Sequence, residues 1–320
     1  MTTLTTTTRR NDAYGRAQGA LLRRCAPGAT TRRIRWRGGE TQVVELGDGP
    51  ALLLVHGGGD AGYEWFPALE ALTAHRRVVV VDRPGHGLAD PFDYRGVDLL
   101  AHATAFLDDV LDALGLEVVD IAGNSMGGIW SLALALDEPQ RVRRLSLVGA
   151  PPGLTRSVPL LLRLGFGLPL VGRSVARRLL ASPSREGSRE FWGRLLVAHP
   201  ELLADDFLDV DVEHMSRNRE SVVSLMCEVV GLGGVRRELL LGERWRRLVV
   251  PTQAVFGERD AFLSAGTWRA WEALASESAC VELVRVPGAG HLPWLDEPAR
   301  VVGAIDRFHA LSTVTEGSTA

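Results

Sequence analysis

The stretch VVDIAGNSMGG at residues 118–128 decides the fold that we expect. Its apolar run 118–122 has the length of a buried strand, and residues 125–136 show the apolar spacing of a helix. The G-x-S-x-G motif at residues 123–127 stands between them. The motif alone is a weak signal in so glycine-rich a chain. Its place between a strand and a helix is what predicts a nucleophilic Ser125.

The two glycines of the motif have a physical reason. A sharp turn leaves little room for side chains on either flank of the serine, so glycine suits positions 123 and 127. The turn also aims the N-terminus of the following helix at Ser125, where developing negative charge is favoured. The alternative interpretation is a serine that only caps this helix.

The rest of the chain continues the alternation of strands and helices. Two strands are expected at residues 32–37 and 41–46, joined by a Gly-Gly hairpin turn. Continuous apolar runs of strand length occur at residues 51–55, 78–81, 118–122, 145–149, 252–256 and 281–286. Helical patterns occupy residues 98–114, 125–136, 268–274 and 299–311. Continuous hydrophobicity is typical of strands buried on both faces, so we predict an α/β fold with a mostly parallel central sheet flanked by helices.

The alternation stops at residues 152–246, which are rich in Leu and Arg and have helical periodicity. We interpret this segment as a helical cap inserted between two parts of the core, residues 31–151 and 247–312. Extra helices packed beside the sheet are the alternative. Residues 1–30 are expected to form a disordered or loosely held N-terminal tail, and residues 313–320 a flexible tail.

A second motif, His-Gly-Gly-Gly at residues 56–59, follows the first continuous apolar run. Small residues at the end of a strand let backbone N–H groups approach a substrate oxygen. We predict an oxyanion hole made by the N–H groups of Gly58 and Met126, with Gly59 as a close rival to Gly58. His56 is expected to fix the loop by hydrogen bonding. A merely flexible glycine-rich turn is the alternative.

Two further residues complete a candidate catalytic triad. Asp260 lies just past a late apolar run, where a carboxylate can orient a histidine base, and Glu258 is its competitor. His291 follows the last apolar run on a glycine-rich loop. The order Ser125, Asp260, His291 along the chain is the order used by hydrolases with a G-x-S-x-G elbow. His86, on an earlier loop, is expected to shape the rim of the pocket.

The binding pocket can be predicted only from residue type and motif position. We name Gly59 and Asn124, which flank the predicted oxyanion hole and nucleophile, as candidate lining residues. Trp65, Trp130 and Trp294 are further candidates, although aromatic residues are more often simply part of the core.

Composition and motif content exclude several function classes. The chain has 320 residues with a net charge of −3, and its basic residues, all arginine, are scattered, which argues against nucleic-acid binding. The sequence has no HExxH motif, Cys/His cluster, Walker loop or dinucleotide motif, so no metal or cofactor is expected. The partner expected is a small-molecule carbonyl substrate, and the oligomeric state stays open.

Localisation is predicted from cysteine usage and apolar runs. The three cysteines are far apart along the chain, which fits a reducing cytoplasm. The N-terminus lacks the apolar region of a secretory signal, and no apolar run approaches the roughly 20 residues that span a bilayer. A cytoplasmic protein without a membrane span is therefore expected.

Taken together, the motifs at residues 56–59, 82–87, 123–128, 257–260 and 288–291 resemble those of the α/β-hydrolase superfamily, in the superfamily's order. The resemblance covers residues 32–311 outside the cap. It implies the α/β-hydrolase fold and a serine nucleophile, which argues against epoxide hydrolases and haloalkane dehalogenases.

Within the superfamily, the elbow and the segment GAGHLPW at residues 288–294 resemble the meta-cleavage-product hydrolases and their esterase relatives. Those carbon–carbon hydrolases usually carry a Gly-Pro-Gly-like oxyanion loop, where this chain has GGGD at residues 57–60. They also place a carboxylate-binding arginine in the cap, and by alignment of the stretch 209–219 its place is taken by Asp211. The second departure puts recognition of a dienoate carboxylate in doubt and favours a plain ester as substrate.

We therefore expect a serine hydrolase that cleaves a small or medium carboxylic ester through an acyl-enzyme intermediate. Carbon–carbon bond hydrolysis of the meta-cleavage-product type is the alternative, because the same triad serves it. A non-enzymatic receptor on the same fold is a remote third hypothesis, against which the intact triad argues.

Overall fold

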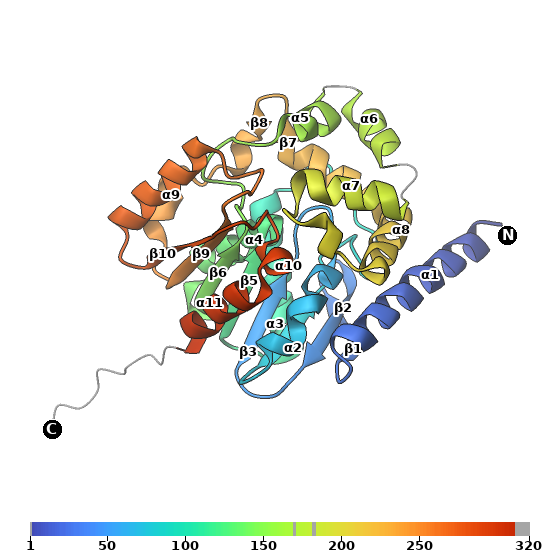
Figure 1. The fold of residues 1–320 in the computed structure, drawn as a ribbon, viewed down its shortest axis with the longest axis horizontal. Helices are drawn as coiled ribbons and strands as arrows, with labels where there is room; N and C mark the ends of the chain where they lie inside the picture. The colour runs from blue at the N-terminus through green and yellow to red at the C-terminus, as the bar shows by residue number, and fades with distance from the viewer. Residues whose placement is uncertain (1, 169–170, 181–183, 311–320) are drawn as a thin grey trace.

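An eight-stranded sheet forms the centre of this computed structural model, which describes residues 2–168, 171–180 and 184–310 (Figure 1). The strand order is β1-β2-β4-β3-β5-β6-β9-β10. The pairs β1/β2 and β2/β4 are antiparallel, and all the others are parallel. The strands are β1 (Thr30–Trp36), β2 (Gly39–Leu46), β3 (Ala51–Val55), β4 (Arg77–Val81), β5 (Val119–Asn124), β6 (Val142–Val148), β9 (Thr252–Gly257) and β10 (Val281–Val286). The mostly parallel sheet predicted from the continuous apolar runs is confirmed.

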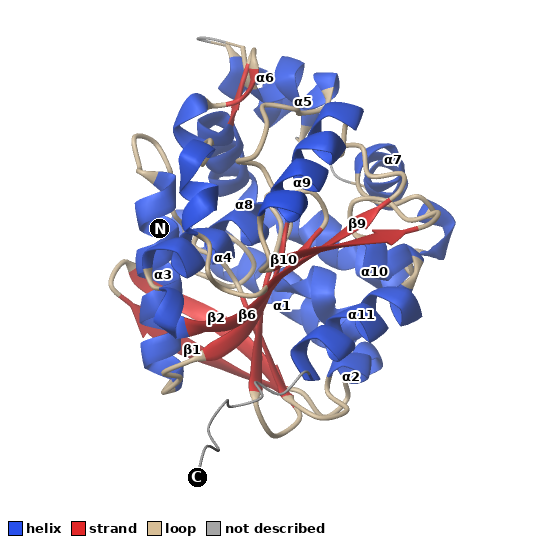
Figure 2. Ribbon diagram, turned by 90° about the vertical axis from the view of Figure 1, so that its left-hand side faces the viewer, coloured by secondary structure: helices blue, strands red, loops and turns tan. Residues whose placement is uncertain are grey.

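Helices cover both faces of the sheet. α3 (Leu99–Leu114) and α4 (Ser125–Asp137) pack together on one face, and α2 (Phe66–Leu72) and α11 (Pro298–Ala310) lie on the other (Figure 2). α9 (Ala265–Glu277) contacts β10, and the short α10 (Pro293–Asp296) leads into α11. This layering buries the strand side chains on both faces of the sheet, which explains why the sequences of the strands are continuous apolar runs.

The ends of α3 show why a helix forms there. The Asp98 side chain accepts hydrogen bonds from the N–H groups of Leu100 and Ala101, at 3.2 and 3.1 Å, and so caps the first turn. Gly115 ends the helix with φ of +69°, a left-handed conformation that glycine adopts at little cost. Both signals lie at the borders of the helix predicted for residues 98–114.

The N-terminal segment corrects one prediction. Residues 1–30 were expected to be disordered or loosely held, but α1 (Thr2–Cys25) is a helix packed against α8 and α2. The side chains of Tyr14 and Leu21 are fully buried. The Thr-rich start suggested disorder, whereas the helical spacing of Tyr14, Gln18, Leu21 and Leu22 builds a buried face. The tail predicted at residues 313–320 lies outside the described residues.

Between β6 and β9 the chain forms four α-helices in the described residues, which we call the cap helices. They are α5 (Leu160–Phe166), α6 (Gly172–Leu179), α7 (Arg185–Leu195) and α8 (Asp205–Val229). A small hairpin, β7 (Val230–Gly231) with β8 (Gly234–Val235), follows α8. Figure 1 shows these elements gathered above the ends of the sheet strands. No helix in the described part of the chain has both the length and the apolar character needed to cross a bilayer.

Candidate active site

Ser125 stands on a strained turn between β5 and α4. Its φ is +48°, and it is the one non-glycine residue with positive φ among the described residues. A Cβ at Gly123 would lie 2.5 Å from the Gly127 carbonyl oxygen, and a Cβ at Gly127 would lie 2.2 Å from the Val55 oxygen. Neither position can therefore hold a side chain. The G-x-S-x-G spacing is thus a consequence of how closely the turn packs against β3 and α4.

Asp260 and His291 meet as the sequence predicts. The His291 Nδ1 atom lies 2.9 Å from both carboxylate oxygens of Asp260, and both side chains are buried. Asp260 also accepts hydrogen bonds from the N–H groups of Ala150 and Phe262, at 2.9 and 2.8 Å. The ring of Phe262 stacks on that of His291 with 4.1 Å between centroids. The imidazole is therefore held at Nδ1 and on one face, which leaves Nε2 as the atom available for proton transfer.

The loop of His291 is fastened to the cap segment. The Asp296 carboxylate accepts hydrogen bonds from the N–H of Gly290 at 2.7 Å and from the N–H of Ala198 at 2.9 Å. The Leu292 N–H donates to the Leu196 carbonyl at 2.9 Å. The position of the base thus depends on the chain that follows α7 as well as on the core.

Ser125 and His291 line the same cavity, which lies between the core and the cap helices. Gly58, Gly59, Asn124 and Met126, all named from the sequence, line it as well. The cap contributes mainly apolar side chains, among them Leu162, Phe166, Met215, Val222 and Met226. The charged or titratable lining residues within the described chain are Asp60, Asp211 and His291, with no arginine among them.

The three tryptophans predicted to line the pocket do not contribute to the cavity wall. Trp65 and Trp294 stack on each other at 4.0 Å in the core, and the Trp294 indole N–H donates to the Glu64 carbonyl at 2.9 Å. Trp130 of α4 packs edge-on against Phe106 of α3. The prediction was wrong because the apolar character of tryptophan suits the core as well as a pocket wall. All three side chains are fully buried among other core side chains.

Three buried histidines contact three consecutive carbonyl groups of the glycine loop, residues 56–59 with the His-Gly-Gly-Gly motif. Their rings lie close together, at 5.2 Å and 6.0 Å between neighbouring centroids. The contacts are His56 Nδ1 to Gly57 O at 2.9 Å, His86 Nε2 to Gly58 O at 3.2 Å and His214 Nε2 to Gly59 O at 3.1 Å.

The hydrogen bonds settle which ring nitrogen carries the proton in two of these histidines. His56 Nε2 accepts from the Arg83 backbone N–H at 2.9 Å, so its Nδ1 donates. His214 Nδ1 accepts from the Asn218 amide at 3.0 Å, so its Nε2 donates to Gly59. Burial lowers the pKa of His56 well below the usual range and that of His214 to about 3. Both rings are therefore neutral at ordinary pH.

These contacts orient the loop's amide groups. The carbonyl of one residue and the N–H of the next belong to one planar, trans peptide unit, so fixing the Gly57 carbonyl also fixes the direction of the Gly58 N–H. The Arg83 guanidinium makes a further, short contact with the Gly57 carbonyl. The Gly57 N–H is already used, because it donates to both oxygens of buried Glu64 at 3.1 and 3.2 Å. Gly58 and Gly59 are the loop residues that line the cavity.

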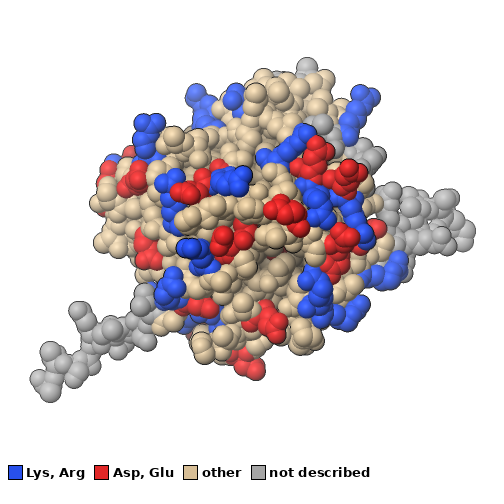
Figure 3. All heavy atoms as spheres, in the orientation of Figure 1, with Lys and Arg blue, Asp and Glu red and all other residues tan. Residues whose placement is uncertain are grey.

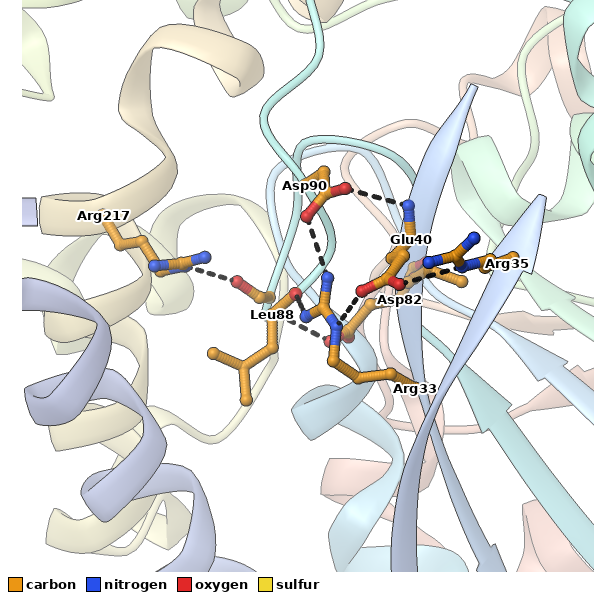
Figure 4. A network of polar contacts seen from close by, with 9 residues as sticks. Arg33, Arg35, Glu40, Asp82, Leu88, Asp90 and Arg217 are labelled. Atoms are coloured by element: carbon orange, nitrogen blue, oxygen red, sulfur yellow. Dashed lines mark hydrogen bonds and ion pairs between the residues drawn. The ribbon is translucent and has the colours of Figure 1, made fainter. Parts of the chain in front are cut away.

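A polar network holds the loop that follows β4, which is the loop that contains His86 (Figure 4). Asp82 accepts from the Leu88 N–H at 2.9 Å, and Arg33 of β1 donates to the Leu88 carbonyl at 2.7 Å. From the other side, Arg217 of α8 reaches the Gly87 carbonyl at 2.8 Å. His86 was expected at the pocket rim, but it is fully buried beneath the glycine loop and is not part of the cavity wall.

An acidic pair in the cavity wall was not predicted as a site. Asp211 accepts hydrogen bonds from the Tyr63 hydroxyl at 2.7 Å and, at short range, from the Ser188 hydroxyl. Burial, together with the negative charge of Asp211, raises the pKa of Asp60 to about 8. Burial also raises the pKa of Asp211 itself. The wall beside the glycine loop is therefore polar, and burial disfavours the charged forms of both carboxyl groups.

Comparison with known proteins identifies the family. A model of the alpha/beta hydrolase family matches residues 52–304, which is most of the chain. The chain belongs to the alpha/beta hydrolase family. The structure of this α/β hydrolase is also similar to that of carboxylesterase CesB from Bacillus subtilis, with a TM-score of 0.72 at 21% identity over 94% of this chain and 98% of the other. At that identity, the likeness concerns the fold.

Two curated relatives of this α/β hydrolase have named activities. It is 26% identical over 276 residues to a pimeloyl-[acyl-carrier protein] methyl ester esterase of Xanthomonas campestris, covering 83% of this chain and 97% of that one. It is 41% identical over 125 residues to 2-hydroxy-6-oxo-2,4-heptadienoate hydrolase of Pseudomonas putida, covering 37% of this chain and 44% of that one. The two relatives represent the two reactions expected from the motifs.

Proposed function

We propose that this α/β hydrolase is a serine hydrolase that cleaves a small or medium carboxylic ester through an acyl-enzyme intermediate. The observation that carries the proposal is the pairing of His291 Nδ1 with both Asp260 oxygens at 2.9 Å, in a cavity that His291 shares with Ser125 on its strained turn. This is the arrangement in which a histidine can activate a serine hydroxyl.

The proposed reaction has two steps. In the first, His291 Nε2 takes the proton of the Ser125 hydroxyl as its oxygen attacks the carbonyl carbon, and then gives the proton to the leaving alcohol. In the second, His291 activates a water molecule that attacks the acyl carbon and frees Ser125. Asp260 holds the ring in one tautomer and stabilises the imidazolium that forms.

An oxyanion hole would stabilise the negative charge on the substrate oxygen. We assign it to the N–H groups of Gly58 and Met126, with Gly59 as the rival of Gly58. Met126 lies in the first turn of α4, where backbone N–H groups have no partner within the helix. The directions of the Gly58 and Gly59 amides follow from the histidine contacts described above. Removing one such donor typically costs about 3 kcal/mol in the transition state.

The second candidate is carbon–carbon bond hydrolysis, favoured by the local 41% identity to the Pseudomonas putida enzyme. A dienoate substrate carries a carboxylate, and a cationic side chain would be its natural partner. Among the described residues, the cavity wall contains no arginine, and its carboxyl groups are those of Asp60 and Asp211. The electrostatics of the cavity therefore favour an uncharged ester over a dienoate.

The experiment is hydrolysis of p-nitrophenyl acetate, butyrate and octanoate by the wild type and by Ser125→Ala. We expect turnover by the wild type and a loss on the order of 10⁴-fold or more in the variant. The preferred chain length then measures the depth of the pocket. A wild type that ignores all three esters but bleaches a coloured dienol substrate would replace the ester proposal with the carbon–carbon one.

A further inference from the structure

The outer end of the cap carries a cluster of exposed apolar side chains that the proposed chemistry does not use. It is formed by α5, the residue just before α6 and the turn between β7 and β8. We call it the cap face. Its members and their exposed fractions are Leu160 63%, Leu161 43%, Leu164 51%, Val171 51% and Leu232 45%. Single exposed apolar residues are common on proteins, but a contiguous group indicates an interaction surface.

The members of the cap face lie next to one another. α5 packs against α6 and against β7, and the Arg163 side chain on α5 donates to the Leu232 carbonyl at 2.7 Å. A Cβ at Gly167, just after α5, would meet the backbone of Gly231 at 2.6 Å. The hairpin turn and the two helices therefore form one continuous surface.

α5 is apolar on both of its sides. Leu162 and Phe166, one turn apart, point inward and line the cavity that contains Ser125. Leu160 and Leu164, also one turn apart, are exposed on the outside. A surface helix normally has a polar outer side. One helical layer thus separates the candidate active site from an apolar exterior.

The charged side chains of the chain segment that forms α5 and α6 are all positive. Residues 149–185 contain six arginines and no aspartate or glutamate. Figure 3 shows blue arginine side chains among tan atoms at this end of the molecule, with the red acidic side chains lying lower. Three of the arginines are paired with acidic residues of α8: Arg173 with Glu228, Arg177 with Glu220, and Arg185 with Asp205 and Asp209. Arg163, which lies in α5 between Leu161 and Leu164, adds positive charge to the cap face itself.

We propose that the cap face docks on an anionic lipid surface. Exposed leucines enter the boundary between headgroups and acyl chains, and flanking arginines contact lipid phosphates. A second copy of this chain fits less well, because a twofold contact places the same patch on both sides and would bring like-charged arginines together. An anionic lipid layer complements both the apolar and the cationic part of the surface.

Docking in this way has a consequence for catalysis, which rests on the proposed function. With α5 against the lipid, an apolar ester leaving the layer has a short path to the cavity wall formed by Leu162 and Phe166. Binding itself does not require Ser125, so it can be measured on a variant that lacks the nucleophile.

The test is co-sedimentation of the full chain with vesicles of phosphatidylcholine and phosphatidylglycerol in equal amounts, and with vesicles of phosphatidylcholine alone. The test variant replaces Leu160, Leu161 and Leu164 with serine. The matched control makes the same change to serine at Val118, Leu202 and Val249. These side chains are exposed at 50%, 60% and 68% and lie elsewhere on the surface. Because all six side chains are exposed, thermal unfolding should show both variants folded.

We expect the wild type, the control and Ser125→Ala to bind the anionic vesicles, with weaker binding to neutral vesicles and at high salt. The triple cap-face variant should bind at least about tenfold more weakly. Equal binding by the cap-face variant and the control would overturn the proposal, and so would no binding by the wild type. Concentration-dependent dimerisation that the cap-face variant abolishes, without vesicle binding, would assign the face to self-association instead. Binding by Ser125→Ala separates this proposal from the hydrolase proposal.

Discussion

His214, on cap helix α8, donates a hydrogen bond from Nε2 to the carbonyl oxygen of Gly59 at 3.1 Å. This bond connects the cap directly to the glycine loop that we assign to the oxyanion hole. His214 does not line the cavity, and so its effect on the reaction acts through the loop.

Replacing His214 tests this connection. His214→Phe keeps an aromatic ring of similar shape but removes the donor. The glycine loop then loses its anchor to α8, and kcat should fall about tenfold with a smaller change in KM, because displacement of the neighbouring oxyanion donors weakens transition-state binding. His214→Gln retains an N–H that can reach the carbonyl and should recover most of the activity. A merely structural role would predict equal kcat for the two variants once both are shown to be folded. That result would contradict the assignment.

The role of Asp260 is tested by Asp260→Asn. The amide keeps the shape of the side chain but can no longer hold His291 with its proton on Nδ1, so kcat should fall on the order of 10³–10⁴-fold. Glu258→Gln is the control, since Glu258 is partly exposed and lies 3.4 Å from Arg285 rather than beside His291. Full activity in Asp260→Asn combined with a large loss in Glu258→Gln would reverse the assignment of the acid.

The pH dependence of stability follows from Asp60. Burial and the charge of Asp211 raise the pKa of Asp60 from 3.8 to about 8. Between these values the folded protein holds a proton that the unfolded chain has released. The free energy of unfolding therefore falls as pH rises through this window, by at most about 1.4 kcal/mol per pH unit.

Asp60→Asn removes this contribution while keeping a neutral side chain of the same shape. Its free energy of unfolding should vary less with pH between about 4 and 8, and should exceed that of the wild type at the alkaline end of the window. Urea unfolding of both proteins across the window measures the difference. Asp82, whose pKa is raised to about 6, is unchanged in both proteins and so cancels. Parallel curves for the two proteins would contradict the prediction.

The N-terminal helix is expected to contribute to stability. Leu21 is fully buried, so Leu21→Ala should lower the free energy of unfolding by about 2–5 kcal/mol. Arg23→Ala, at an exposed position two residues further on, should change it by less than about 0.5 kcal/mol. Denaturant unfolding checks both values. Equal stability of the two variants would mean that α1 is not part of the folded core.

Local pattern was sufficient to predict the sheet and the turn at Ser125. The strand runs are continuous because both faces of the sheet are covered, and the spacing of Gly123 and Gly127 reflects contacts with backbone atoms that leave no room for a Cβ. These features are encoded in a few adjacent residues. The pairing of Asp260 with His291 was also predictable, because the carboxyl ends of parallel strands meet at one edge of the sheet.

The residues that the sequence did not reveal act through contacts between distant segments. Asp60 and Asp211 lie 151 positions apart and meet only because α8 crosses the glycine loop. His214 gives a weak signal, since it shares a buried helical stripe with Asp211 and Asn218, and polar residues on such a stripe need partners. The prediction that Trp65, Trp130 and Trp294 line the pocket was wrong because residue type alone does not show whether a side chain faces the cavity or the core.

In the proposed reaction, Ser125 carries the acyl group. The most direct measurement is intact-protein mass spectrometry after rapid acid quench of the wild type with p-nitrophenyl butyrate, followed by peptide mapping. We predict a mass increase of one butyryl group on the peptide that contains Ser125, its persistence in an Asp260→Asn variant slowed in deacylation, and its absence in Ser125→Ala. Ester turnover with the acyl group on another residue, or undiminished turnover by Ser125→Ala, would contradict the account.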